Sequence, residues 1–223
     1  QGAVVVEAST GVEIKGNYIG VGLNADHAVT NGGHGILIAH STNILVGGDW
    51  PSYHNTIAGS AGDGIHVTGG SAESPVSIIG NIVGLRTTNG HVMGNAGHGL
   101  FLDNAPCVAV GGATDYSGNT IGWCGGWGVL ITGAVSQANT LRFNKIGTDR
   151  DALNSATNGR GGVAVWNAPA NRIGEENAGN YMAGNNGPGV AIFGEGSASN
   201  SVINNYIGLG QNANLTLPNI GSG

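Results

Sequence analysis

One short phrase returns along the chain at nearly constant spacing, and it restricts the fold more than any other feature. Its first copy is Gly16-Asn17-Tyr18-Ile19-Gly20. The asparagine of each copy falls at Asn17, Asn81, Asn144 and Asn205, in steps of 64, 63 and 61 residues. Self-similarity at a fixed period indicates a repeat architecture, in which each unit packs mainly on its neighbours. We therefore expect residues 1–223 to form one repeat domain.

A second mark divides each long repeat into two units. It is a glycine followed by apolar residues, as in Gly35-Ile36-Leu37-Ile38. It recurs every 27 to 35 residues, at Gly2, Gly35, Gly64, Gly99, Gly128, Gly162 and Gly189. Each unit contains about three short, β-branched segments separated by turn-forming residues, a pattern typical of strands and turns. No stretch of ten residues shows helical periodicity.

These units predict a solenoid, because three short strands cannot bury an apolar face alone but stacked copies can. We expect an all-β, right-handed, single-stranded parallel β-helix of about seven coils, with a two-coil superrepeat of about 64 residues. The handedness follows from the bias of parallel crossovers. Counting from each marker glycine, positions one and three should point inward and position two outward. In the first coil this places Ala3 and Val5 inside and Val4 outside.

Alternate coils carry a loop at the same place, over residues 21–31, 85–95, 148–158 and 209–219. Its clearest copy runs Ile146-Gly147-Thr148-Asp149, then Ala152-Leu153, then Asn158-Gly159. Over essentially the whole chain, these phrases resemble those of bacterial and archaeal extracellular proteins built from right-handed parallel β-helix repeats. The resemblance implies the fold and an extracellular or cell-surface location. The family shares no single activity, so the resemblance implies none here.

Composition excludes two classes of partner. The chain has 13 carboxylates against 7 Lys plus Arg, which argues against nucleic acid, since phosphates require a basic surface. No apolar run approaches the roughly 18 to 20 residues that cross a bilayer, so we expect no membrane span. The two cysteines do not form a Cys-x-x-Cys metal framework, and no cofactor is expected beyond a weakly bound divalent cation.

The repeated asparagines have a structural explanation. Asparagine tolerates left-handed backbone conformations and bonds to its own turn, so we interpret Asn17, Asn81, Asn144 and Asn205 as turn residues. The residues that follow them, among them Tyr18, Ile82, Lys145 and Tyr206, should point outward. The sequence gives these outward positions no role.

A sharper candidate precedes the marker glycines on three consecutive coils, as His34, Asp63 and His98, with His66 three residues after Asp63. Such a column could hold a metal ion or poise a general base. A hydrogen-bonded turn is the competing interpretation, and it is the one that we favour.

Other side chains suggest weaker hypotheses. An acidic stripe is expected from Asp49, Asp115 and either Glu175 or Glu176. A local salt-bridge patch is expected from Arg142, Arg150 and Arg160. Loop aromatics could stack on sugar rings or merely cover the core; these are Trp50, Tyr53, Trp123 and Trp127. Cys107 and Cys124 are 17 residues apart, and they form either a disulfide, adding about 3 kcal/mol, or two free thiols.

Neither end of the sequence resembles a capping repeat. The chain enters through Ala3-Val4-Val5-Val6 and leaves through Asn219-Ile220-Gly221. The leading hypothesis is a non-enzymatic extracellular structural protein that stacks head to tail into a filament, about 33 Å per subunit, or joins further repeats. The alternative is a β-helix that binds or processes a polysaccharide as a lyase, epimerase or hydrolase. Enzymatic activity is therefore left open, but it is not favoured.

Overall fold

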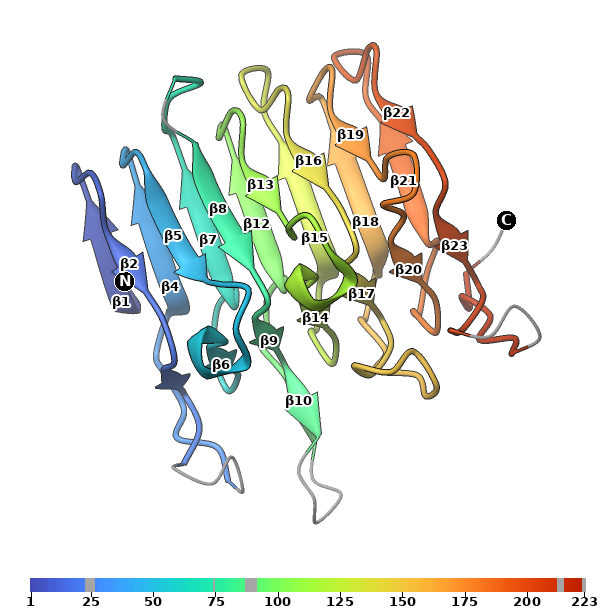
Figure 1. Cartoon of the computed structure of the whole chain (residues 1–223), viewed down its shortest axis with the longest axis horizontal. Coiled ribbons are helices and arrows are strands. Elements are labelled where there is room, and N and C mark those ends of the chain that lie inside the picture. Colours follow the sequence, from blue (N-terminus) through green and yellow to red (C-terminus); the bar gives the residue numbers. More distant parts are fainter. Residues whose placement is uncertain (23–26, 74, 87–91, 212–214, 222–223) are drawn as a thin grey trace.

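The chain winds through three parallel sheets that form the sides of a column (Figure 1). The structure is a computed structural model that describes residues 1–22, 27–73, 75–86, 92–211 and 215–221. Sheet 1 contains β1 (Gly2–Glu7), β4 (His34–Ala39), β7 (Ile65–Thr68), β12 (Leu100–Asp103), β15 (Trp127–Thr132), β18 (Gly161–Trp166) and β21 (Val190–Phe193).

The other two sheets have the same number of strands in the same chain order. Sheet 2 contains β2 (Glu13–Ile14), β5 (Ile44–Gly47), β8 (Val76–Ile79), β13 (Ala109–Val110), β16 (Thr140–Leu141), β19 (Arg172–Ile173) and β22 (Ser201–Val202). Sheet 3 contains β3 (Tyr18–Ile19), β6 (Thr56–Ile57), β9 (Ile82–Val83), β14 (Thr120–Ile121), β17 (Lys145–Ile146), β20 (Tyr181–Met182) and β23 (Tyr206–Ile207).

The predicted all-β parallel solenoid is therefore confirmed. The chain passes each sheet seven times, so six complete turns separate the first strand of a sheet from the last. This is slightly fewer than the seven coils expected. Within the described residues, no helix is long and apolar enough to span a membrane; the helical elements are two single 3₁₀ turns, η1 (Pro51–Tyr53) and η2 (Asp115–Ser117).

Strand pairing keeps equivalent residues in line, so each inward column is continuous. In sheet 1, Ile36 pairs with Ile65, which pairs with Leu100, and all three are fully buried. The inward side chains of the three sheets form one apolar cluster that runs from Val6 to Met182. The core is thus a rod of stacked aliphatic side chains, and burial of this surface is the main stabilising contribution.

The first coil departs from the expected register by one residue. Val4, not Ala3, pairs with Ile36, so Val4 and Val6 point inward and Val5 is 49% exposed. Because the side-chain period of a strand is two, a slip of one residue exchanges the two faces. Ala3 to Val6 are all apolar, so no polar residue marks the outward face of this strand. Counting positions from the marker glycine therefore does not determine which of these residues point inward.

The predicted loops leave the column at one corner, between sheet 3 and the next strand of sheet 1 (Figure 1). Each begins as a short antiparallel pairing: Val21 with Ala28, Thr148 with Ser155, Leu209 with Thr216, and β10 (Leu85–Arg86) with β11 (Val92–Met93). Residues 23–26, 87–91 and 212–214 of these loops, and Ser222 and Gly223, lie outside the described residues. The loop at residues 148–158 is described throughout.

Candidate functional site

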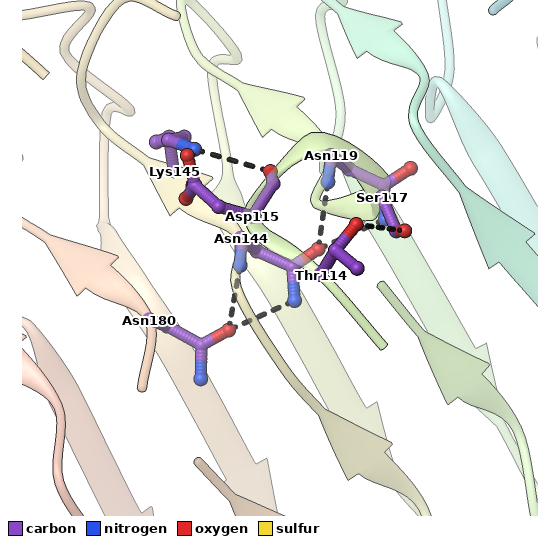
Figure 2. Close-up of polar contacts among 7 residues, drawn as sticks. All are labelled: Thr114, Asp115, Ser117, Asn119, Asn144, Lys145 and Asn180. Atoms are coloured by element: carbon purple, nitrogen blue, oxygen red, sulfur yellow. Dashed lines mark hydrogen bonds and ion pairs between the residues drawn. The ribbon is translucent and has the colours of Figure 1, made fainter. Parts of the chain in front are cut away.

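The repeated asparagines form a ladder inside the column. Asn144 Oδ1 accepts hydrogen bonds from the backbone N–H of Asn119 at 3.0 Å and from its Nδ2 at 2.9 Å. Asn180 Oδ1 accepts the equivalent pair from Asn144 (Figure 2). The same pattern links all seven coils, through Asn17, Asn55, Asn81, Asn119, Asn144, Asn180 and Asn205. These side chains satisfy backbone donors at a buried corner, so they are part of the scaffold.

The ladder fixes what lies on the outer face of sheet 3. Strands that follow a ladder asparagine alternate between one outward and one inward residue, as in Thr120 and the fully buried Ile121. The outward residues form one column along the sheet: Tyr18, Thr56, Ile82, Thr120, Lys145, Tyr181 and Tyr206. This column is the floor of the candidate site.

One side of this floor is built by η2, which is tied to the column by polar contacts. Lys145 is 7% exposed, and its Nζ lies 2.5 Å from Oδ1 of Asp115 in η2 (Figure 2). Ser117 Oγ donates a hydrogen bond to Asp49 Oδ1, two coils away, at 2.7 Å, and lies 2.8 Å from Thr114 Oγ1. The short helix is therefore held at both of its ends.

Three adjoining hollows lie along this floor, and together we call them the sheet-3 groove. The first, of about 550 Å³, extends from Tyr18 to the loop after β17 and includes Trp123 and Arg150. The second, of about 210 Å³, shares Arg150 with the first and contains Asp115 and Lys145. The third, of about 530 Å³, shares Asp115 with the second and is lined by Tyr181 and Tyr206. The groove thus runs along the solenoid axis.

Aromatic and cationic groups face the groove. The rings of Tyr181 and Tyr206 are stacked, with centroids 4.6 Å apart and an interplanar angle of 11°. Burial, then the neighbouring Tyr206 and Asp115, raise the pKa of Tyr181, so its hydroxyl remains a hydrogen-bond donor at neutral pH. Arg150 forms no ion pair within the described part of the chain. Thr148 lines the same hollow, and its buried Oγ1 lacks a hydrogen-bond partner among the described residues.

The expected salt-bridge patch of three arginines does not form, because the three side chains lie on different faces of the solenoid. Arg142 pairs with Glu175 at 3.2 Å, Arg150 lines the sheet-3 groove, and Arg160 lies beside Trp127 on the outer face of sheet 1. Three acidic residues of the expected stripe already have partners. Asp49 accepts from Ser117, Asp115 binds Lys145, and Glu175 binds both Arg142 and Arg172.

The four loop aromatics are also dispersed. Trp123 lines the sheet-3 groove, whereas Trp127 lines a hollow of about 530 Å³ on sheet 1 with Trp166 and Phe193. Trp50 is 69% exposed, and the ring of Tyr53 lies 5.0 Å from Nζ of Lys15.

The predicted column of His34, Asp63 and His98 is a second ladder, in which each side chain accepts a backbone N–H from the next coil. Asp63 N–H donates to His34 Nδ1 at 3.1 Å, and His98 N–H donates to Asp63 Oδ1 at 2.7 Å. Trp127 N–H donates to His98 Nδ1 at 3.0 Å. These bonds agree with the hydrogen-bonded turn favoured from the sequence over a metal site or general base. His98 Nδ1 is directed at Trp127, and the imidazole that joins His34 and Asp63 is that of His66.

Cys107 and Cys124 are both free, so the disulfide alternative is not realised. They occupy different corners of the coil. Cys107 has a positive φ of 57° in the turn before β13, equivalent to Asn43, whereas Cys124 follows β14 and its N–H donates to Asn158 Oδ1 at 3.1 Å. Burial raises the pKa of the Cys124 thiol to about 11, so it is an unreactive core residue at neutral pH.

Comparison with known proteins adds no functional assignment. No family model matches the chain, and no curated protein or solved structure shows significant similarity to it. The sequence interpretation missed the sheet-3 groove, although the outward column beside the repeated asparagines was its visible signal. What it lacked was the position of η2 and of the loop after β17, which turn this column into a groove.

Proposed function

We propose that the chain binds an extended polysaccharide along the sheet-3 groove. The observation that carries the proposal is that three hollows adjoin along one sheet, since the central hollow shares Arg150 with one neighbour and Asp115 with the other. An extended chain of sugars matches a long, shallow groove better than a small compact ligand does. The regular strand spacing of the solenoid supports recognition of a ligand that also repeats.

The side chains of the groove suit sugars. Tyr18 and Tyr206 are about half exposed, at 54% and 45%, and can offer aromatic faces to the C–H faces of sugar rings. Thr56 and Thr120 supply hydroxyls along the floor between them. Arg150, which has no carboxylate partner within the described residues, favours a polysaccharide that carries carboxylates.

Binding is better supported than cleavage, because two of the three carboxylates that line the groove among the described residues, Asp115 and Asp149, already have partners, which leaves Asp151 alone. Asp115 is bound to Lys145. Asp149 accepts hydrogen bonds from Leu153 N–H, Asn154 N–H and Asn154 Nδ2, and so fixes its own loop. Acid–base cleavage of a glycosidic bond needs two carboxyl groups placed on either side of the bond.

The test is retention in affinity electrophoresis on gels containing polygalacturonate, with neutral xylan as the comparison. Arg150→Gln and Tyr206→Ala should each weaken retention about fivefold or more, since truncating an arginine or aromatic contact commonly costs over ~1 kcal/mol. Arg172→Gln is the matched control for charge, because Arg172 is 56% exposed at its side chain and lies on sheet 2. Trp50→Ala is the control for aromatic surface.

Loss of retention in the two groove variants alone supports the proposal. The proposal is wrong if the parent chain is retained by neither polysaccharide, or if the control variants lose as much retention as the groove variants. Preferential retention on xylan would contradict the role given to Arg150.

Head-to-tail association is a second candidate function, supported by the last described coil. Its inward residues Ile192, Val202 and Ile207 are 41%, 42% and 46% exposed, whereas the residues that they pair with, Val165, Ile173 and Met182, are fully buried. A further coil, from whichever chain, would cover these side chains and pair with the strand edges. At a different corner of the coil, Asn185 N–H and Nδ2 donate to Asn219 Oδ1 at 3.1 and 3.0 Å.

A further inference from the structure

A cluster on the outer face of sheet 1, away from the sheet-3 groove, brings two imidazoles to one carboxylate oxygen. Asp63 Oδ2 lies 3.0 Å from His66 Nδ1 and 3.2 Å from His34 Nδ1. His34 begins β4 and His66 lies in β7, the next strand of the sheet. The donor atoms of the three residues all lie within 4.8 Å of one another. We propose that His34, Asp63 and His66 bind a divalent transition-metal ion such as Zn²⁺.

The spacing of these atoms matches that of ligands around one ion. Ligands at about 2.0–2.1 Å from Zn²⁺ in a tetrahedral arrangement are about 3.3 Å from each other. The two distances from Asp63 Oδ2 fall close to this value, and the donor atoms of His34 and His66 lie within 4.8 Å of each other. Two imidazoles and one carboxylate are a common protein ligand set for zinc, and water completes the coordination.

Protonation favours the same conclusion. His34 Nδ1 accepts the N–H of Asp63 at 3.1 Å, so this nitrogen carries a lone pair and not a proton. Asp63 accepts the N–H of His98 through Oδ1 at 2.7 Å, and its Oδ2 faces His66 Nδ1 at 3.0 Å. Two hydrogen-bond acceptors, His34 Nδ1 and Asp63 Oδ2, therefore face each other at 3.2 Å.

A cation relieves this contact between acceptors. The ion would displace the proton from His66 Nδ1, and this proton would pass to water. The ion would also bind the lone pair of His34 Nδ1, which in its absence accepts the N–H of Asp63. The surroundings hold the ligands in place. Asp63 is 6% exposed with its Oδ1 fixed by His98 N–H, and the ring of His66 lies between those of His34 and Phe101, both with centroids 4.6 Å away. Such fixing of ligands by outer contacts is typical of built metal sites.

The test measures binding of Zn²⁺ to the metal-free chain by isothermal titration calorimetry and by metal analysis after gel filtration. We expect one ion per chain, and His66→Gln should weaken binding more than tenfold, as loss of a ligand exceeds the 10–100-fold effect of outer contacts. His98→Gln is the matched control. His98 lies in the same column and accepts Trp127 N–H through Nδ1 in the same way as His34 accepts Asp63 N–H, but it is not in the cluster.

Asp63→Asn tests the carboxylate, with circular dichroism to establish that each variant is folded. His66→Gln keeps the test valid if Asp63→Asn does not fold, because His66 lies on the outer face of β7 and its ring accepts no backbone ladder bond. Absence of stoichiometric binding to the parent chain overturns the proposal. So does binding that survives His66→Gln, or that falls equally in His98→Gln.

Discussion

At the scale of single residues, the asparagine ladder explains why one amino acid recurs at the corner of every coil. The corner leaves two donors on each coil, a backbone N–H and a side-chain Nδ2, facing a single Oδ1 of the next coil. An aspartate would supply the oxygen but not the Nδ2 that reaches back, as Asn144 Nδ2 reaches Val110 O at 3.0 Å. The position needs a side chain that accepts two hydrogen bonds and donates two, as Asn144 does, and asparagine is the shortest that can do so.

The ladder predicts that replacing an asparagine in an interior coil destabilises the fold more than replacing the asparagine of the first coil. Asn144→Ala should lower the free energy of unfolding by about 2 to 4 kcal/mol, because the buried N–H of Asn119 loses its acceptor and its Nδ2 keeps only the bond to Ile78 O. Asn17→Ala is the matched control and should cost under about 1 kcal/mol, since Asn17 is exposed and begins the ladder. Urea unfolding followed by circular dichroism measures both. Equal losses in the two variants would show that the ladder does not stabilise the interior coils.

At the scale of elements, the sheet-3 groove depends on irregular segments placed on a regular sheet. The floor belongs to seven equivalent strands, but η2 is fixed to it through the contact between Lys145 and Asp115. The other members of its column are threonines, tyrosines and Ile82, so Lys145 is the one cation of that column. A buried ammonium group requires a close anionic partner, and Asp115 is therefore drawn onto the strand.

This contact predicts a local effect rather than a global one. Lys145→Met should change the free energy of unfolding by about 1 kcal/mol or less, because the Asp115 side chain is 56% exposed and can be solvated when unpaired. Hydrogen–deuterium exchange at residues 114–118 should nevertheless become faster, since η2 loses this tie to β17. Arg172→Met, which removes a cation from the Glu175 pair on sheet 2, should leave this exchange unchanged. Unaltered exchange in Lys145→Met would mean that Ser117 alone holds η2.

The elements also show where sequence reasoning succeeds and where it stops. Interior strands are well predicted, because a marker glycine and alternating aliphatic residues allow one register only, as at Ile65 and Val67. The register expected for the first strand is wrong by one residue, because Ala3 to Val6 are all apolar and no polar residue marks the outer face. Contacts between coils are harder to predict. His66 joins His34 through its place in the neighbouring strand, which a comparison of equivalent columns does not reveal.

At the scale of the whole molecule, the apolar rod of the core is covered on its sides but open at its last described coil. The three partly exposed residues there, Ile192, Val202 and Ile207, are positioned as buried residues are in every interior coil. Contact of this face with another coil would bury aliphatic surface, which is favourable at about 25 cal/mol per Å². Unpaired strand edges at the same face add a hydrogen-bonding template.

We therefore expect the 223-residue chain to associate as its concentration rises, and Val202→Glu should suppress this association because it places a charge on the open face. Val135→Glu is the matched control, since Val135 is 53% exposed and lies outside the inward columns of the three sheets. Light scattering over a concentration series measures both. A monodisperse monomer at high concentration, or equal suppression by the two substitutions, would contradict head-to-tail association.

The glycines at the corner after sheet 2 give the fold a further property. Gly47 and Gly111 have a positive φ of 84°, and a Cβ on either would collide with a carbonyl oxygen of a neighbouring coil, that of Ile79 or of Arg142. This close approach recurs in alternate coils, whereas the ladder bonds join every coil to the next, so the contacts repeat by coil pairs. We therefore expect such a chain to lengthen or shorten by about 64 residues without losing these contacts, whereas a residue with a Cβ in place of Gly47 or Gly111 would be strained.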